Sequence, residues 1–234
     1  MADNKNNAQS AAGKTEQTLN QNEAFVLKYQ KLIIAAVVVL IVAIGAFLFI
    51  RNQSQTRHDK AATVLSVGQQ LFELEMYEQA LNGDSTTTFV GFAQLATELS
   101  GDDANLANLY AGLCCAKLDK WAEAEQYLEK FSGEGDQMIS PAALGALGNV
   151  YAHDPAKMDK AVETLKKAAK QANNQTLSPT FLIQAGQLLE SQGKKAEALA
   201  AYQDAKTYID GMSQEQQKHN QRLNIDAYIE RVAE

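Results

Sequence analysis

The chain has 234 residues, of which 28 are acidic and 21 basic, and its formal net charge at pH 7 is −7. The acidic excess lies after residue 60, where 24 acidic residues stand against 14 basic ones. An acidic segment without a basic stripe argues against nucleic acid as a partner, because phosphates require clustered lysine and arginine. The segment is long enough for one domain.

The first segment, residues 1–24, is polar and rich in asparagine, glutamine, alanine and threonine. It has no apolar periodicity, and such a composition cannot bury enough apolar surface to offset the entropy lost on folding. We predict a disordered polar tail.

The next segment, residues 25–57, contains 19 consecutive residues without a charge, 32–50. As a helix this stretch would be roughly 28 Å long, close to the ~30 Å thickness of the hydrocarbon layer of a bilayer. A helix buried in a soluble core would normally have a polar face, and a cleaved signal would have a shorter apolar core behind a short basic region. The pattern therefore predicts an uncleaved transmembrane anchor over 32–50 with a juxtamembrane extension to residue 57.

The orientation of this anchor is not decided by charge, because three basic residues lie near each end. A short polar segment before the span and a large domain after it favour a cytoplasmic tail and a domain on the other side of the membrane.

The remaining residues, 58–234, show the apolar spacing of amphipathic helices. The first predicted helix runs from Ala61 to about Leu81, and turn residues from Gly83 separate it from a second helix that ends at Leu99. We predict a degenerate helix pair over 61–99.

An internal repeat follows. Gly112, Gly148 and Gly186 are 36 and 38 residues apart, and similar small and large apolar residues recur around each of them. The recurring residues are Cys115, Trp121, Ala124 and Leu128, then Tyr151, Ala161, Leu165 and Ala168, then Leu189, Ala198, Tyr202 and Ala205. The predicted helix pairs cover residues 105–131, 141–170 and 179–208. Ser140-Pro141 and Ser178-Pro179 predict helix starts with a serine N-cap and a proline at the first helical position.

These residues resemble the tetratricopeptide repeat over about 105–208. Cys115 and Leu189 replace the tyrosine that is usual in the first helix, and the spacing exceeds the usual 34 residues. The resemblance implies a tetratricopeptide-like α-solenoid of about four helix pairs. With the anchor predicted from residues 32–50, the expected fold is all-α, with a single N-terminal transmembrane helix before the solenoid. A helix over 213–232 would cap its C-terminal end, as solenoids require.

The layout of one apolar span before several helix pairs is similar to that of the YfgM-type ancillary subunits of the Sec translocon. That resemblance implies a single-pass protein of the bacterial inner membrane with its C-terminal domain in the periplasm. The implied partners are other proteins, namely translocon components or periplasmic chaperones, together with the lipid bilayer around 32–50.

No residue pattern predicts a catalytic, cofactor-binding or metal-binding site. The three histidines are far apart in sequence, and phosphate-binding glycine motifs do not occur. Cys114 and Cys115 are adjacent on a predicted helix and are interpreted as buried thiols without a redox role. The acidic residues Glu123, Glu125 and Glu129 are interpreted as a solvated helix face.

The tetratricopeptide resemblance implies that the first helix of each pair lines a concave surface. The partner-binding candidates on this surface are Leu106, Leu109, Leu113, Asn149, Ile183 and Gln187. Only Asn149 fits the pattern of a site for a C-terminal carboxylate. An alternative interpretation is that the helix pair over 61–99 covers the three leucines.

We therefore expect a membrane-anchored, non-catalytic scaffold or adaptor that assists protein export, envelope protein folding or complex assembly. The alternative is a chaperone-like holder that binds unfolded segments in its apolar groove. A scaffold should capture a few stoichiometric partners, whereas a holder should suppress the aggregation of unrelated unfolded proteins.

Overall fold

The computed structural model describes residues 39–49, 51–52, 58–84, 88–133, 135–213 and 224–233. The chain divides into two compact units, Met1–Asp59 and Lys60–Glu234, and each is described by itself.

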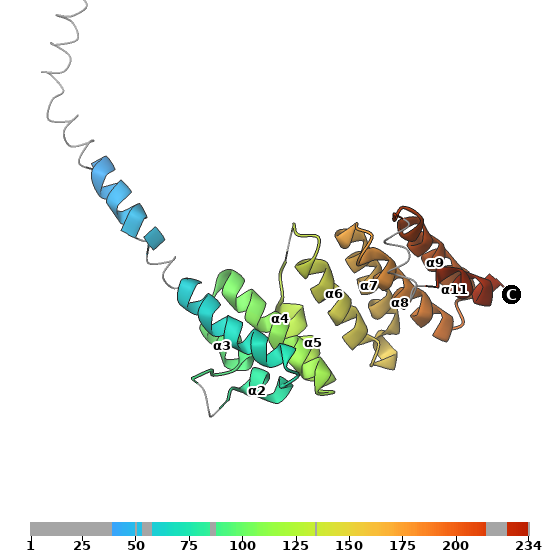
Figure 1. Ribbon diagram of the computed structural model, residues 1–234, viewed down its shortest axis with the longest axis horizontal. Helices are drawn as coiled ribbons and strands as arrows, with labels where there is room; N and C mark the ends of the chain where they lie inside the picture. The colour runs from blue at the N-terminus through green and yellow to red at the C-terminus, as the bar shows by residue number, and fades with distance from the viewer. Residues whose placement is uncertain are drawn as a thin grey trace, which may run out of the picture. The chain divides into compact units, whose positions relative to one another are not determined.

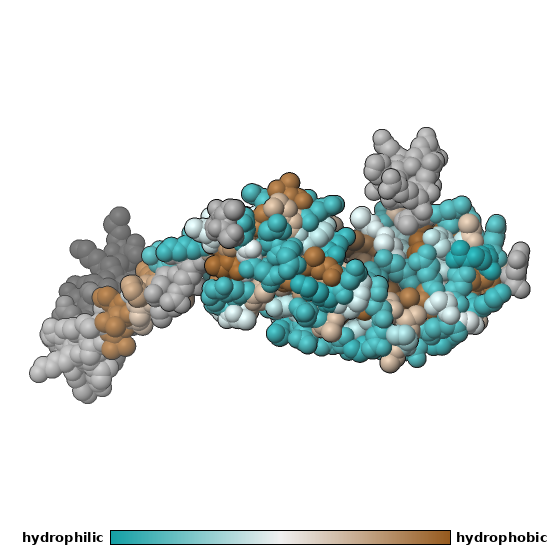
Figure 2. Space-filling view, turned by 90° about the horizontal axis from the view of Figure 1, so that it is seen from below, coloured by the Kyte–Doolittle hydropathy of each residue, from teal (hydrophilic) through white to brown (hydrophobic). Residues whose placement is uncertain are grey.

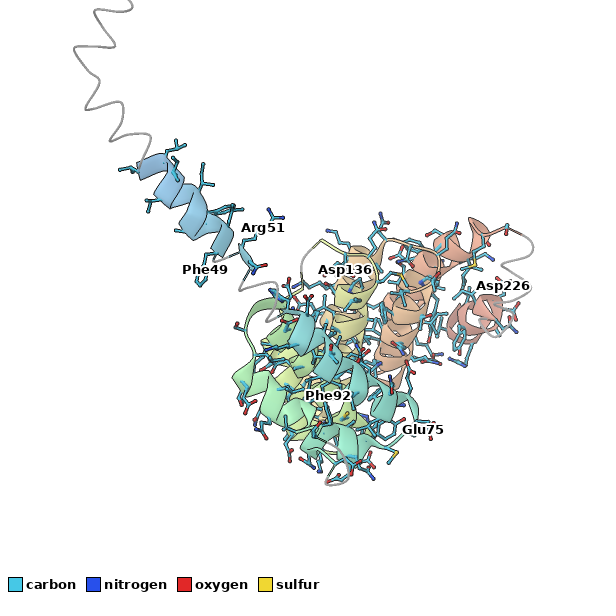
Figure 3. The ribbon with its side chains drawn as sticks, turned by 60° about the vertical axis from the view of Figure 1, so that its left-hand side comes forward. Phe49, Arg51, Glu75, Phe92, Asp136 and Asp226 are labelled. Atoms are coloured by element: carbon cyan, nitrogen blue, oxygen red, sulfur yellow. The ribbon has the colours of Figure 1, made fainter. Side chains whose placement is uncertain are left out.

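In the first unit, residues 39–49 and 51–52 are helical (Figure 1). Every side chain from 39 to 49 is exposed, and Phe49, labelled in Figure 3, is 70% exposed. Among the described residues, no helix has both the length and the apolar character that crossing a bilayer requires. The predicted tail 1–24, and residues 32–38 and 50 of the predicted span, lie outside the described residues.

The second unit begins with three helices where the sequence predicts two. The helix over residues 58–73 ends at a turn in which Glu75 has a φ of 59°, and α2 (Tyr77–Asn82) follows. The next helix, α3 (Phe92–Glu98), starts well after the turn residues expected to precede it. Gly83 and Gly91 both have positive φ, and a side chain on Gly91 would collide with the backbone of Gly83. The first predicted helix, Ala61 to Leu81, is thus interrupted at residues 74–76, and the helix that ends before Leu99 begins only at Phe92.

Three helix hairpins follow, consecutive along the second unit in Figure 1. Their first helices are α4 (Gly101–Lys117), α6 (Ile139–Tyr151) and α8 (Ser178–Ser191). Their second helices are α5 (Trp121–Lys130), α7 (Met158–Ala172) and α9 (Lys195–Asp210), with a short 3-10 helix, Pro155–Lys157, before α7. A final helix, α11 (Ile225–Ala233), packs against α9. The part of the predicted capping helix at 214–223 lies outside the described residues.

The three repeat glycines lie where the two helices of a hairpin cross. A Cβ on Gly112 would lie 2.6 Å from Cγ of Leu128, and a Cβ on Gly148 would lie 2.8 Å from Cγ of Leu165. A Cβ on Gly186 would meet the ring of Tyr202 in the same way. Each glycine therefore permits an approach that a larger residue would prevent.

The helix starts at Ser140 and Ser178 differ from the prediction, because neither serine is the N-cap. Asp136 accepts hydrogen bonds from the backbone N–H groups of residues 138–140 and from the Ser140 hydroxyl (Figure 3). Before α8, the Asn174 side chain accepts from the N–H groups of residues 176 and 177, which form the turn that leads into the helix. At α6, a residue four positions before the serine thus satisfies free N–H donors of the helix start, whereas at α8 the corresponding residue stabilises the preceding turn.

The core of the second unit consists of two clusters of buried apolar side chains. The first joins the three N-terminal helices to α4, α5 and α6, and includes Leu65, Phe92 and Leu147. The second joins α7, α8, α9 and α11, and includes Leu165, Tyr202 and Val232. Each cluster thus joins successive layers, as expected of a solenoid, and the half-buried Leu188 packs against both clusters.

Candidate protein-interaction surface

The six predicted binding residues lie on the first helices of the three hairpins, but they differ in accessibility. Leu109 is 7% exposed and Ile183 is 5% exposed, so both side chains belong to the core. Leu106 and Leu113 are half-buried, whereas Asn149 and Gln187 are exposed. The structure therefore leaves fewer residues free for a partner than the sequence pattern indicates.

On the first hairpin, the helices between 58 and 98 cover part of α4. Tyr110 stacks on Phe92 with ring centroids 5.0 Å apart, and it meets the edge of Phe72 at 5.5 Å. Leu106 and Leu113 pack against the same apolar cluster, which contains Leu109 itself. The leucines thus contribute to packing between layers.

On the third hairpin, α11 occupies the side of α8 where two candidates lie. Ile183 belongs to the buried cluster that contains Val232, and the Gln187 amide donates to the Tyr228 hydroxyl at 3.3 Å. Arg231 donates to both carboxylate oxygens of Glu190, at 2.6 and 2.7 Å. These hydrogen bonds hold the pKa of Glu190 below its ordinary value.

The accessible surface that remains is centred on α6. Ala142, Asn149 and His153 are exposed, and Ser191 of α8 is exposed as well. Asn149 has no hydrogen-bond partner within the described part of the chain, so its amide can both donate and accept. His153 stacks on Trp121 with ring centroids 3.4 Å apart. Asn149 thus offers an uncharged hydrogen-bonding group on an exposed side of α6, and the face of the domain seen in Figure 2 is mostly hydrophilic.

A series of ion pairs, which the sequence analysis missed, connects successive layers. Lys120, Lys157 and Lys194 each directly precede the second helix of a hairpin, and they are 37 residues apart. Each lysine pairs with an acidic residue of the preceding layer. The pairs are Lys120 with Glu78 at 3.5 Å, Lys157 with Glu125 at 2.6 Å, and Lys194 with Asp159 at 2.6 Å. The regular spacing of these lysines is the feature of the sequence from which the ion pairs could have been predicted.

Two of the glutamates interpreted as solvated therefore have structural partners. Glu125 binds Lys157, and Glu129 accepts hydrogen bonds from the Tyr151 hydroxyl at 2.7 Å and from Lys160 at 3.1 Å. Hydrogen bonds from Tyr151 and Lys160 lower the pKa of Glu129. Glu125 and Glu129 of α5 therefore contact the next hairpin. This contact could be recognised only from the positions of α6 and α7.

Cys114 and Cys115 are fully buried and form no disulfide. Burial, and secondarily the neighbouring Cys115, raises the pKa of the Cys114 thiol to about 12. Burial also raises the pKa of Cys115 to about 11. Both thiols stay protonated at neutral pH, and a protonated, buried thiol is a poor nucleophile. The described residues contain no group of three or more metal-ligating side chains.

Comparison with known proteins gives one family match. The family described as tetratricopeptide repeat-like domain matches residues 23–226. No curated protein matches the chain, and no solved structure matches it. The match covers the three hairpins and also the apolar stretch before them.

Proposed function

The chain belongs to the tetratricopeptide repeat-like domain family, and from this membership we propose that it is a membrane-anchored, non-catalytic scaffold that binds other proteins. Domains of this kind generally mediate protein-protein interactions. The observation that carries the proposal is the row of stacked helix hairpins with an exposed polar surface around Asn149 on α6. The protonated, buried thiols agree with a role that needs no nucleophile.

The membrane anchor in this proposal rests on residues 32–50. The described part, 39–49, is a helix whose apolar side chains are all exposed, and such a surface is stable only when something apolar covers it. The family match begins at residue 23, so the stretch lies within the family's domain. Replacing Val39 and Leu40 with lysine would place two charges in the span, each costing about 2.5–3.5 kcal/mol on insertion scales. We expect that variant to leave the membrane fraction on carbonate extraction, and continued retention would contradict the anchor.

The cellular role in this proposal follows the similarity to YfgM-type subunits. We place the C-terminal domain in the periplasm of a bacterial inner membrane, where it would assist protein export, envelope protein folding or complex assembly. Translocon components and periplasmic chaperones are the proposed partners. Protease added to intact spheroplasts should digest the domain if it is periplasmic, and complete protection would contradict this orientation.

Partner binding is tested by a photo-crosslinking amino acid placed at Asn149 in the full chain in cells. A scaffold should give a few discrete crosslinked products at this position. The control is the same amino acid at the exposed Glu163 of α7. Diffuse crosslinking to many proteins, together with suppression of aggregation in vitro, would indicate the holder instead. The burial of Leu109 makes the holder less favourable, because an apolar side chain that it would use lies in the core.

A further inference from the structure

A groove lies along the contact between α5 and α6, and the packing of the hairpins leaves it open. One part has a volume of about 420 Å³ and is lined from both helices by aliphatic and aromatic side chains together with Glu129. A second part, of about 460 Å³, is bounded by the loop before α6 and by α7. Phe131 and Leu144 line both parts, so the two are adjoining. We call the two parts together the α5–α6 groove.

The α5–α6 groove is separate from the surface around Asn149. Its lining residues on α6 include Leu144, Leu147 and Tyr151, which follow one another at helical spacing and therefore share one side of the helix. Asn149 is two residues from Leu147 and from Tyr151, and at about 100° per residue it lies on the opposite side of α6. A partner in the groove would consequently use a different face from a partner at Asn149.

The charges at the two ends of the groove differ. At one end, Glu129 is already compensated by Tyr151 and Lys160. At the other end, the exposed Lys167 lines the groove and forms neither an ion pair nor a hydrogen bond within the described residues. Its neighbours on the groove wall, Gln171 and Gly133, are uncharged. Lys167 is therefore a cation without a partner among the described residues, and the carboxylate of Asp136 is hydrogen-bonded to the groove residue Ser140.

Apolar surface continues beside this cationic end. Met138 is 55% exposed and Ile139 is 53% exposed, and they directly precede Ser140, which lines the groove. Met138 and Ile139 thus add two exposed apolar side chains directly before the groove residue Ser140.

We propose that the α5–α6 groove binds a short peptide segment of a partner protein in which aliphatic side chains are flanked by carboxylates. The aliphatic groups would fill the hollow around Phe131 and Leu144, and a carboxylate would pair with Lys167. Residues after 60 carry 24 acidic and 14 basic side chains, so the net charge of the domain disfavours a segment with carboxylates. Pairing with Lys167 would therefore favour the groove over the rest of the surface. This inference rests on the proposed scaffold function and adds the site and the chemical class of the partner.

The inference is tested on the full chain in a mild detergent with a fluorescein-labelled peptide of alternating glutamate and leucine. Fluorescence anisotropy should show saturable binding, and peptides with lysine for glutamate or serine for leucine should bind more weakly. The Lys167→Glu variant should weaken binding by about fivefold, the order of one charged contact. Lys166→Glu makes the same change in charge on the same helix outside the groove, and it should change the affinity by less than about twofold.

A second variant tests the hollow itself. Gln171 is half-buried on α7 and lines the groove, so Gln171→Trp places a large ring in it and should reduce binding by about fivefold or more. The control is Lys170→Trp, at the exposed neighbouring residue. An unchanged thermal midpoint of each variant would show that the fold is retained.

Three results would overturn the inference: no binding of the glutamate–leucine peptide, equal weakening by Lys167→Glu and Lys166→Glu, or equal binding of the serine peptide. Binding to vesicles with anionic lipid, but not to the peptide, would assign the lysines to a membrane surface and would also overturn it. Crosslinks at Asn149 report on the scaffold function independently, since Lys167→Glu leaves that face unchanged. Crosslinks there without peptide binding would reject only the groove.

Discussion

Gly148 offers the sharpest test of the helix packing. We consider the variant Gly148→Leu, in which the first added atom would lie 2.8 Å from Cγ of Leu165 and 3.3 Å from its backbone nitrogen. The Leu165 side chain can shift its end, but its backbone nitrogen is held in α7. The remaining leucine atoms would have to separate α6 from α7.

The expected cost can be estimated from two opposing effects. Overpacking typically costs about 1–3 kcal/mol, and the backbone contact places this site at the upper end. Leucine has a better helix propensity than glycine, which stabilises the folded variant by roughly 0.8 kcal/mol. The net loss is about 2 kcal/mol, which corresponds to a decrease of about 4–8 °C in the thermal midpoint for a domain of this size.

The assay is thermal unfolding of the full chain in detergent, followed by far-ultraviolet circular dichroism. Asn149→Leu is the matched control, because it adds leucine at the next residue of the same helix on an exposed side. Its midpoint should be unchanged or slightly higher. Hydrogen exchange should also accelerate in α5 and α8, since each layer of a solenoid is stabilised by its neighbours. Equal midpoints for Gly148→Leu and the control would refute the assignment of Gly148 to a helix crossing.

Three further predictions concern the core and the ionisable groups. Leu109→Ser should lower the free energy of unfolding by about 2–5 kcal/mol because it empties a buried apolar site, and a normal melting curve would contradict its burial. The thiols of Cys114 and Cys115 should react with a thiol reagent at pH 8 only after denaturant is added, and rapid modification of the native protein would show that they are accessible. Because Arg231 lowers the pKa of Glu190, the stabilisation from this pair is complete above the ordinary value of 4.5 and is lost as the pH falls through the lowered value in the folded state. Glu190→Gln should therefore be less stable than the wild type at neutral pH, and the difference should shrink in acid; a difference independent of pH would refute the role of this ion pair.

The repeat glycines show what local sequence can determine. Gly112, Gly148 and Gly186 were recognisable because two helices can approach closely only where one side chain is absent, and this requirement recurs in each hairpin. Amphipathic spacing likewise predicted the helices, since burial of one face is a property of each segment. The all-α solenoid followed from these two signals and agrees with the family match.

The residues at layer boundaries could not be assigned in this way. Leu109 and Ile183 have the sequence signature of a concave surface, yet other helices bury both side chains. The sequence indicated that Glu125 is solvated, but Nζ of Lys157, 32 positions later in the chain, lies 2.6 Å from Oε2 of Glu125. Whether a side chain on a helix meets solvent or another layer depends on elements distant in the sequence, and local periodicity carries no information about them.

The sequence by itself thus determined the three hairpins and their glycine crossings, because these depend on neighbours within about one repeat. Only the tertiary structure decided which face stays open. The first three helices cover part of α4, α11 covers part of α8, and α5 and α6 leave a groove that ends at Lys167. The physical reason is that exposure is set by the sum of contacts from all layers, whereas helix formation and pairing are set by contacts within one.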